Sequence, residues 1–149
     1  MIKKLILMIV ILLGLTACSE KKLILESTKD IPLNESIEFN DYSVETLEDL
    51  AAFLVTVTEI ENNKPVTITK VKKTFDWSIE EQEKDSYIVS AKYRDSTFKI
   101  PVTHSNHKVY TDIGYASVER NDEIYPLGSI LPYLITEVQN DPKYLDYLK

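Results

Sequence analysis

Apolar and polar residues alternate through the second half of the chain. Apolar side chains occupy alternate positions over 87–93 and 98–102, and two further runs, 108–119 and 123–127, are also predicted strands. Alternation with period two is typical of a β-strand that buries one face. Short polar turns separate the runs, and such links join antiparallel neighbours. The pattern therefore predicts an antiparallel β-meander.

The chain before this meander has a less regular pattern. A short strand is predicted over 37–42, and a capping box with apolar residues at helical spacing predicts a helix over 46–53. The β-branched residues of 54–60 favour a strand, as does the threonine and lysine alternation of 65–75. The acidic segment 76–86 shows neither period, so we expect a loop or a short exposed helix there.

Helical spacing returns near the carboxyl end. Ser129 is the predicted cap of a helix through Gln139, and Asp141 followed by Pro142 predicts a last helical turn. The predicted fold class is α+β: an antiparallel β-meander of about five or six strands, with a short helix before it and one or two short helices at the C-terminus. We assign these elements to a single domain over 37–149.

A polar segment, 18–36, precedes this domain. We expect a tether that would reach roughly 60 Å if fully extended, at about 3.3 Å per residue. Leu23, Ile24 and Leu25 interrupt its polarity, and an edge strand at these residues is the alternative to a free tether.

The first 17 residues have the layout of an export signal. Two lysines form a basic start, and residues 5–15 form an uncharged run of eleven. A helix that crosses a bilayer needs roughly 20 apolar residues, so this run is too short to span one. The small residues Thr16 and Ala17 then precede Cys18, the single cysteine of the chain, as expected near a cleavage site.

The residues Leu15, Thr16, Ala17 and Cys18 resemble the lipobox of bacterial lipoproteins. The resemblance implies that the thiol of Cys18 takes a diacylglycerol and that the chain is cut between Ala17 and Cys18. Two acyl chains hold a protein stably on a bilayer, whereas one binds only marginally. The expected location is therefore the cell envelope, with the domain facing outward from the cytoplasm.

The residue after the cysteine bears on which membrane holds the anchor. An aspartate there commonly favours retention in the inner membrane of Gram-negative cells, and this chain has Ser19. We expect the outer membrane in a Gram-negative cell, and otherwise the outer leaflet of the cytoplasmic membrane. Because Cys18 has no partner cysteine, the exported domain must fold without an internal disulfide.

The mature chain is acidic. Removal of residues 1–17 leaves 132 residues, with 15 lysines and arginines against 24 aspartates and glutamates, a balance of −9. This sign opposes binding to nucleic acid, which depends on cationic contacts to phosphate, and it permits a basic protein or peptide partner. The sequence also lacks glycine-rich phosphate loops and the common hydrolase and metalloprotease motifs.

Two histidines offer candidate chemistry. Asp112 could complete a metal site with His104 and His107, and either histidine could serve as a general base. Two ligands do not define a site, so we predict no metal, no cofactor and no catalytic residue. The carboxylates of 80–85 lack the spacing of an EF-hand. We interpret them as a solvated acidic loop and as the preferred place for a basic partner to dock.

Nine tyrosines are present in the chain. Tyrosine is frequent in binding patches, but it is also common on the half-buried faces of strands. Four tyrosines fall in predicted strands and are expected in the core: Tyr87, Tyr93, Tyr110 and Tyr115. Tyr144 and Tyr147 are expected to close the domain onto its sheet.

An anchor and a small acidic domain without catalytic motifs favour a non-enzymatic binding module of the envelope. One form of this hypothesis is a protective lipoprotein of the immunity or exclusion type, which blocks a secreted or incoming factor. The first alternative is a structural or assembly accessory of an envelope complex. The second is an enzyme with an unrecognised site that uses His104 or His107. Cys18 is the one residue to which the sequence assigns a chemical role.

Overall fold

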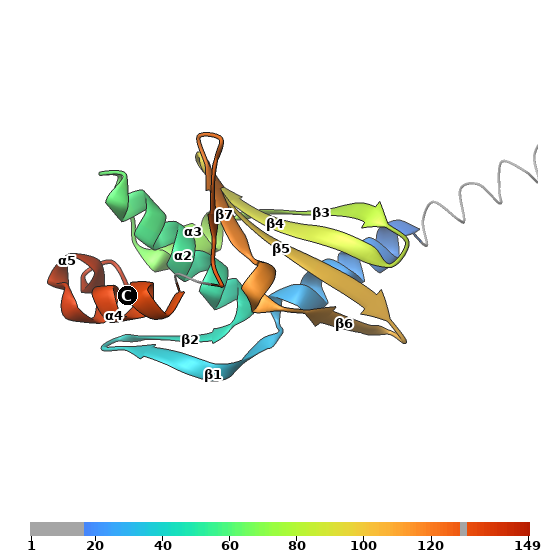
Figure 1. The fold of residues 1–149 in the computed structure, drawn as a ribbon, viewed down its shortest axis with the longest axis horizontal. Helices are drawn as coiled ribbons and strands as arrows, with labels where there is room; N and C mark the ends of the chain where they lie inside the picture. Colours follow the sequence, from blue (N-terminus) through green and yellow to red (C-terminus); the bar gives the residue numbers. More distant parts are fainter. Residues whose placement is uncertain (1–16, 129–130) are drawn as a thin grey trace, which may run out of the picture.

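The computed structural model describes residues 17–128 and 131–149 (Figure 1). The predicted signal up to residue 16 and the predicted helix cap at Ser129 lie outside these ranges. Residues 17–29 form an N-terminal helix. The elements after it are β1 (Pro32–Phe39), β2 (Tyr42–Thr46), α2 (Leu47–Glu61), α3 (Ile68–Thr74), β3 (Asp76–Glu83), β4 (Ser86–Tyr93), β5 (Ser96–Ser105), β6 (Lys108–Thr111), the 3-10 helix η1 (Ile113–Tyr115), β7 (Ser117–Arg120), β8 (Glu123–Pro126), α4 (Leu131–Asn140) and α5 (Pro142–Leu145).

Within the described ranges, six strands form one antiparallel sheet in the order β3-β4-β5-β7-β8, with β6 also paired to β5. Strands β6 and β7 pair with opposite halves of the same edge of β5. The predicted strand over 108–119 is therefore two strands, and η1 separates them. The predicted α+β class and its antiparallel meander are confirmed.

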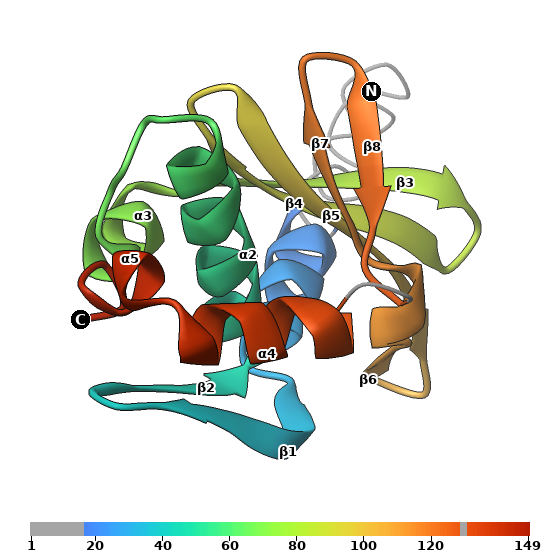
Figure 2. The same cartoon turned by 60° about the vertical axis from the view of Figure 1, so that its left-hand side comes forward.

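Strands β4 and β5 alternate between two environments, as their sequence pattern predicts. Their buried side chains share one face of the sheet: Tyr87, Val89, Ala91, Tyr93, Phe98, Ile100 and Val102. The N-terminal helix and α2 cover this inner face (Figure 2). Removal of these apolar side chains from water is the main driving force for the fold.

Helix α2 begins where the sequence predicts and extends eight residues beyond the predicted end. The capping box is confirmed, because the Thr46 side chain accepts from the Asp49 amide and the Asp49 side chain accepts from the Thr46 amide. The strand predicted over 54–60 is wrong. Residues 50–57 are all buried, with the sheet on one side and β2 and α3 against α2 elsewhere. Packing on several sides outweighs the preference of β-branched residues for strands.

The predictions for 65–75 and 76–86 are also wrong. The Thr67 side chain caps α3, which buries Ile68 and Val71 at helical spacing. Strand β3 forms because β4 pairs with it along its whole length, while its carboxylates face solvent at the sheet edge. Charged side chains on an edge strand also hinder pairing with another chain.

The segment 18–36 is folded. Its residues through 29 are helical, so the edge strand considered for Leu23, Ile24 and Leu25 is wrong. Ile24 and Thr28 are fully buried on this helix. The chain then enters β1, which pairs with β2 in a hairpin separate from the six-stranded sheet.

The C-terminal helices close the domain against α2 and the hairpin (Figure 2). Helix α5 begins with the predicted cap, Asp141, followed by a proline. Tyr144 is fully buried, and its hydroxyl donates to Glu61 at the end of α2, not to the sheet onto which it was expected to close. Burial, and then this hydrogen bond, raise the pKa of Tyr144 to about 12. The half-buried Tyr147 contributes a carbonyl that accepts from the Ile68 amide at 2.8 Å.

Candidate functional site

Cys18 is exposed near the start of the N-terminal helix. Two residues of the next turn fix this end of the helix to the sheet. Glu20 Oε1 lies 3.3 Å from His104 Nδ1 on β5, and Lys21 Nζ lies 3.7 Å from Glu81 Oε2 on β3. The predicted lipidation residue therefore lies beside the ends of β3 and β5.

The structure separates the residues considered for a metal site. The His104 side chain is largely buried beside Glu20, whereas His107 is exposed in the β5–β6 turn with a φ of 60°. Asp112 caps η1, with its Oδ1 accepting from the Gly114 amide at 2.8 Å. Within residues 17–128 and 131–149, no three His, Cys, Asp or Glu side chains are grouped closely enough to hold a metal ion.

The acidic residues 80–85 belong to the edge of the sheet, which corrects the predicted loop. Glu80 to Glu83 are in β3, and Asp85 is in the β3–β4 turn with a φ of 62°. All of these side chains are exposed. Five carboxylates against one lysine between Asp76 and Asp85 make this edge a negative border.

The face of the sheet opposite the inner face, here called the outer face, carries polar and short apolar side chains. Its members come from β4, β5 and β7: Ile88, Ser90, Lys92, Thr97, Lys99, Pro101, Ser117 and Glu119. All are half-buried or exposed. Lys99 Nζ lies 2.5 Å from Glu119 Oε2, so an ion pair links neighbouring strands on this face.

Adjoining hollows run along the outer face. A hollow of about 600 Å³ lies over β3, β4, β5 and β7, and Tyr115 lines it. Tyr115 and Tyr110 also line a hollow of about 310 Å³ on the side of β6. These two tyrosines are 74% and 51% exposed, so their predicted core position is wrong, whereas Tyr87 and Tyr93 are buried as predicted. The outer face thus combines exposed aromatic rings with a concave polar surface.

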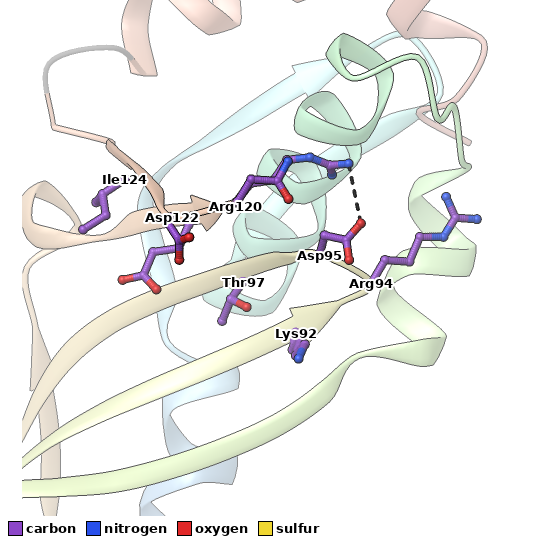
Figure 3. Close-up of a pocket in the computed structure, with 9 residues that line it drawn as sticks. Lys92, Arg94, Asp95, Thr97, Arg120, Asp122 and Ile124 are labelled. Carbon is purple, nitrogen blue, oxygen red and sulfur yellow. Dashed lines mark ion pairs between the residues drawn. The ribbon is translucent and has the colours of Figure 1, made fainter.

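A further hollow, of about 460 Å³, lies where the β4–β5 and β7–β8 turns meet, and we call it the turn-end hollow. Figure 3 shows Asp95 from the first turn facing Arg120 from β7, with Arg94 beyond Asp95 and Asp122 on the other side. Arg94 has a φ of 52°, a region that most side chains avoid. Its guanidinium lies 5.0 Å from the centroid of the Tyr93 ring. Cationic and anionic groups are mixed around this hollow.

A buried charge cluster lies behind the turn-end hollow. Glu59 of α2 is fully buried, and its Oε1 accepts from Ser96 Oγ at 2.8 Å and from Arg120 Nη1. Its Oε2 accepts from Arg94 Nη1 at 3.2 Å. Ser96 Oγ also accepts from Arg120 Nη1 at 2.9 Å. Because Ser96 is fully buried and bonded on both sides, this serine and carboxylate join α2 to the sheet and are not open to a substrate.

The sequence reasoning missed this cluster. The available signal was the period of β7, in which Arg120 shares the inward direction of the buried Val118. An arginine at an inward position requires a buried acceptor. The acceptor, Glu59, is on another element, and sequence periodicity does not identify such a partner.

Comparison with known proteins gives no match among family models, curated proteins or solved structures. Among the described helices, none combines the length and apolar character required to cross a bilayer.

Proposed function

We propose that this protein is an envelope lipoprotein, anchored through acylated Cys18, whose domain is a non-enzymatic module that binds a protein or peptide on its outer face. The anchor is supported by the lipobox-like residues and by the exposure of Cys18 next to the folded domain. The single observation that carries the binding role is the hollowed outer face with its exposed tyrosines.

The composition of the outer face suits a protein partner. Tyrosine contributes a large contact area and a hydroxyl at low conformational cost, and it is enriched among residues that dominate binding energy. Tyr115 stands beside the polar floor formed by Ser90, Lys99 and Ser117. Non-obligate protein interfaces combine aromatic side chains with polar groups that form hydrogen bonds across the interface.

Charge narrows the class of partner. Glu80 and Gln82 of β3 line the wall of the hollow of about 600 Å³, and Glu80 brings the negative charge of this edge to it. A basic segment lying across the outer face would bring its cations to this wall, which favours association and correct orientation. The proposed partner is therefore a protein or peptide with a basic surface, encountered outside the cytoplasm.

The experiment is site-specific photo-crosslinking in the producing cells. Tyr115→benzoylphenylalanine places the probe on the outer face, and Tyr133→benzoylphenylalanine is the matched control because Tyr133 is equally exposed on α4. We expect a discrete adduct from position 115 that is absent from position 133. Glu80→Lys should weaken the adduct, whereas Asp146→Lys, a charge reversal at the C-terminal end, should not.

Intact mass of the membrane fraction tests the anchor in the same cells. The mature wild-type chain should carry the mass of the lipid, and Cys18→Ala should abolish that mass. Equal adducts from positions 115 and 133, or none from the outer face, would contradict the binding role. A wild-type chain without lipid would contradict the anchor.

A further inference from the structure

The segment that could have been a free tether is part of the fold. The described chain is helical from residue 17, and Ile24 on this helix is fully buried in the core. Ile24 lies six positions after Cys18. The distance between the anchor and the first core residue is therefore short.

The covalent geometry sets an upper limit on that distance. Six residues of α-helix rise about 9 Å. If all six unwound, they would reach at most about 20 Å, a third of the roughly 60 Å allowed by a fully extended tether over 18–36. The contact of Glu20 with His104 and the ion pair of Lys21 with Glu81 favour the shorter arrangement.

The elements around Cys18 define one end of the molecule. The β3–β4 and β5–β6 turns meet there, because the His104 amide donates to the Asp85 carbonyl at 2.9 Å. Figure 1 shows the first described residues of the N-terminal helix at this end and α5 with the C-terminus at the other. The β7–β8 turn, which borders the turn-end hollow, lies well away from the start of the helix in the same view.

We propose that the domain stands directly on the bilayer, with the β3–β4 and β5–β6 turns against the lipid head groups and the turn-end hollow directed away from the membrane. This orientation rests on the proposed acylation of Cys18. Three exposed lysines at this end, Lys22, Lys84 and Lys108, offset the charge of Glu81, Glu83 and Asp85 beside them, so the short connection, and not charge, carries the orientation. The exposed Tyr110 has the amphipathic character that is favoured at a membrane interface.

This orientation decides which parts of the domain a partner protein can reach. A partner in solution reaches the turn-end hollow without approaching the membrane, whereas the β6 end of the outer face lies close to the lipid. Contacts that extend from one hollow to the other would thus align the partner along the membrane normal.

The test uses the acylated full-length mature protein in vesicles of phosphatidylcholine and phosphatidylglycerol that carry a head-group acceptor dye. Acylation blocks the thiol of Cys18, the one native cysteine, so an added cysteine is the single labelling site. Lys108→Cys marks the membrane end and Glu123→Cys marks the β7–β8 end, and both positions are exposed. Energy transfer from position 108 should be about twofold or more above that from position 123, because the short connection holds the first close to the lipid.

A flexible insertion tests whether the short connection between Cys18 and the core causes the difference in energy transfer between the two labels. About twelve Gly and Ser residues inserted after Ser19 allow the domain to rotate and move away, since such a linker behaves as a random coil. The difference in transfer between the two labels should then largely disappear.

Equal or reversed transfer in the uninserted protein overturns the orientation while leaving the anchor intact. A difference that survives the insertion overturns the role of the short connection. A chain that carries no lipid by intact mass and does not float with the vesicles overturns the anchor, and the orientation with it.

Discussion

The two faces of the six-stranded sheet are built from the same strands and have opposite properties. On β5, Phe98 and Ile100 are fully buried under helices, while Lys99 between them is half-buried on the outer face. The inner face holds the fold together through apolar burial. The outer face carries charges, hollows and exposed tyrosines. Stability and the proposed recognition are thus assigned to alternate residues of one strand.

The ion pairs on the two sides of the sheet also differ in how deeply they are buried. Glu59 and Arg120, on the inner side, are 0% and 5% exposed, whereas Lys99 and Glu119 on the outer face are 38% and 33% exposed. A buried charge that loses its partner is costly, and an exposed pair contributes about 0–1 kcal/mol. Position on the sheet therefore decides how much each pair matters for folding.

The strongest test of the difference between the two faces is a pair of alanine substitutions at neighbouring residues of β5. Phe98→Ala should lower the free energy of unfolding by about 4 kcal/mol, because it removes a fully buried aromatic ring from the core. Lys99→Ala should lower it by less than about 1 kcal/mol, since it removes one exposed ion pair. Urea unfolding followed by the fluorescence of Trp77 measures both. Similar losses for the two variants would contradict the assignment of stability to one face.

Removal of the buried arginine should have the next largest effect. Arg120→Met leaves Glu59 buried without its main cationic partner, and we expect a loss of about 3 kcal/mol in the free energy of unfolding. The double variant Glu59→Gln and Arg120→Met should recover much of that loss, because no uncompensated charge remains. Urea unfolding of the full double-mutant cycle measures the coupling. Additive losses would show that the two side chains do not act as a pair.

The sequence predicts the inner face of the sheet better than the outer face. The strict alternation of β4 and β5 identifies the inner residues, such as Phe98, and by elimination the outer ones, such as Lys99. The sequence predicts core positions for Tyr110 and Tyr115 because both fall in a run whose pattern predicts a single strand. Instead, η1 interrupts this run and carries the exposed Tyr115, whereas Tyr110 lies in β6 with its ring exposed.

Long-range packing explains the remaining misses. Residues 54–60 have strand propensities, yet burial on several sides keeps them helical as part of α2. Strand β3 carries too few apolar residues to show a period of two, and its pairing with β4 determines its conformation. The contact of Glu59 with Arg120 joins residues 61 positions apart, which local pattern cannot predict.

A smaller loss than that of Phe98 or Arg120 is expected for an ion pair of intermediate exposure at the start of α2. Asp49 Oδ1 lies 2.6 Å from Lys72 Nζ, and its Oδ2 accepts from the amides of Thr46 and Glu45 at 3.1 and 3.2 Å. Burial opposes ionisation of this carboxyl, but the hydrogen bonds from Lys72, Thr46 and Glu45 outweigh it and lower its pKa below 3.8. The ionised form of Asp49 therefore stabilises the helix that covers the inner face.

The sign of the pH dependence follows from that shift. The stabilisation is present in full above the unfolded-state pKa of about 3.8 and is lost as the pH falls through the lower folded-state pKa. Asp49→Ala should lower the free energy of unfolding by about 1–2 kcal/mol at neutral pH, the usual cost of a lost helix cap with its partners. The difference in unfolding free energy between Asp49→Ala and wild type should shrink as the pH falls below the unfolded-state pKa of about 3.8. Asp146→Ala, which removes a carboxylate that is 79% exposed, is the control and should have little effect at any pH. A loss at Asp49 that is independent of pH would indicate that its packing, and not its charge, holds α2 against the inner face.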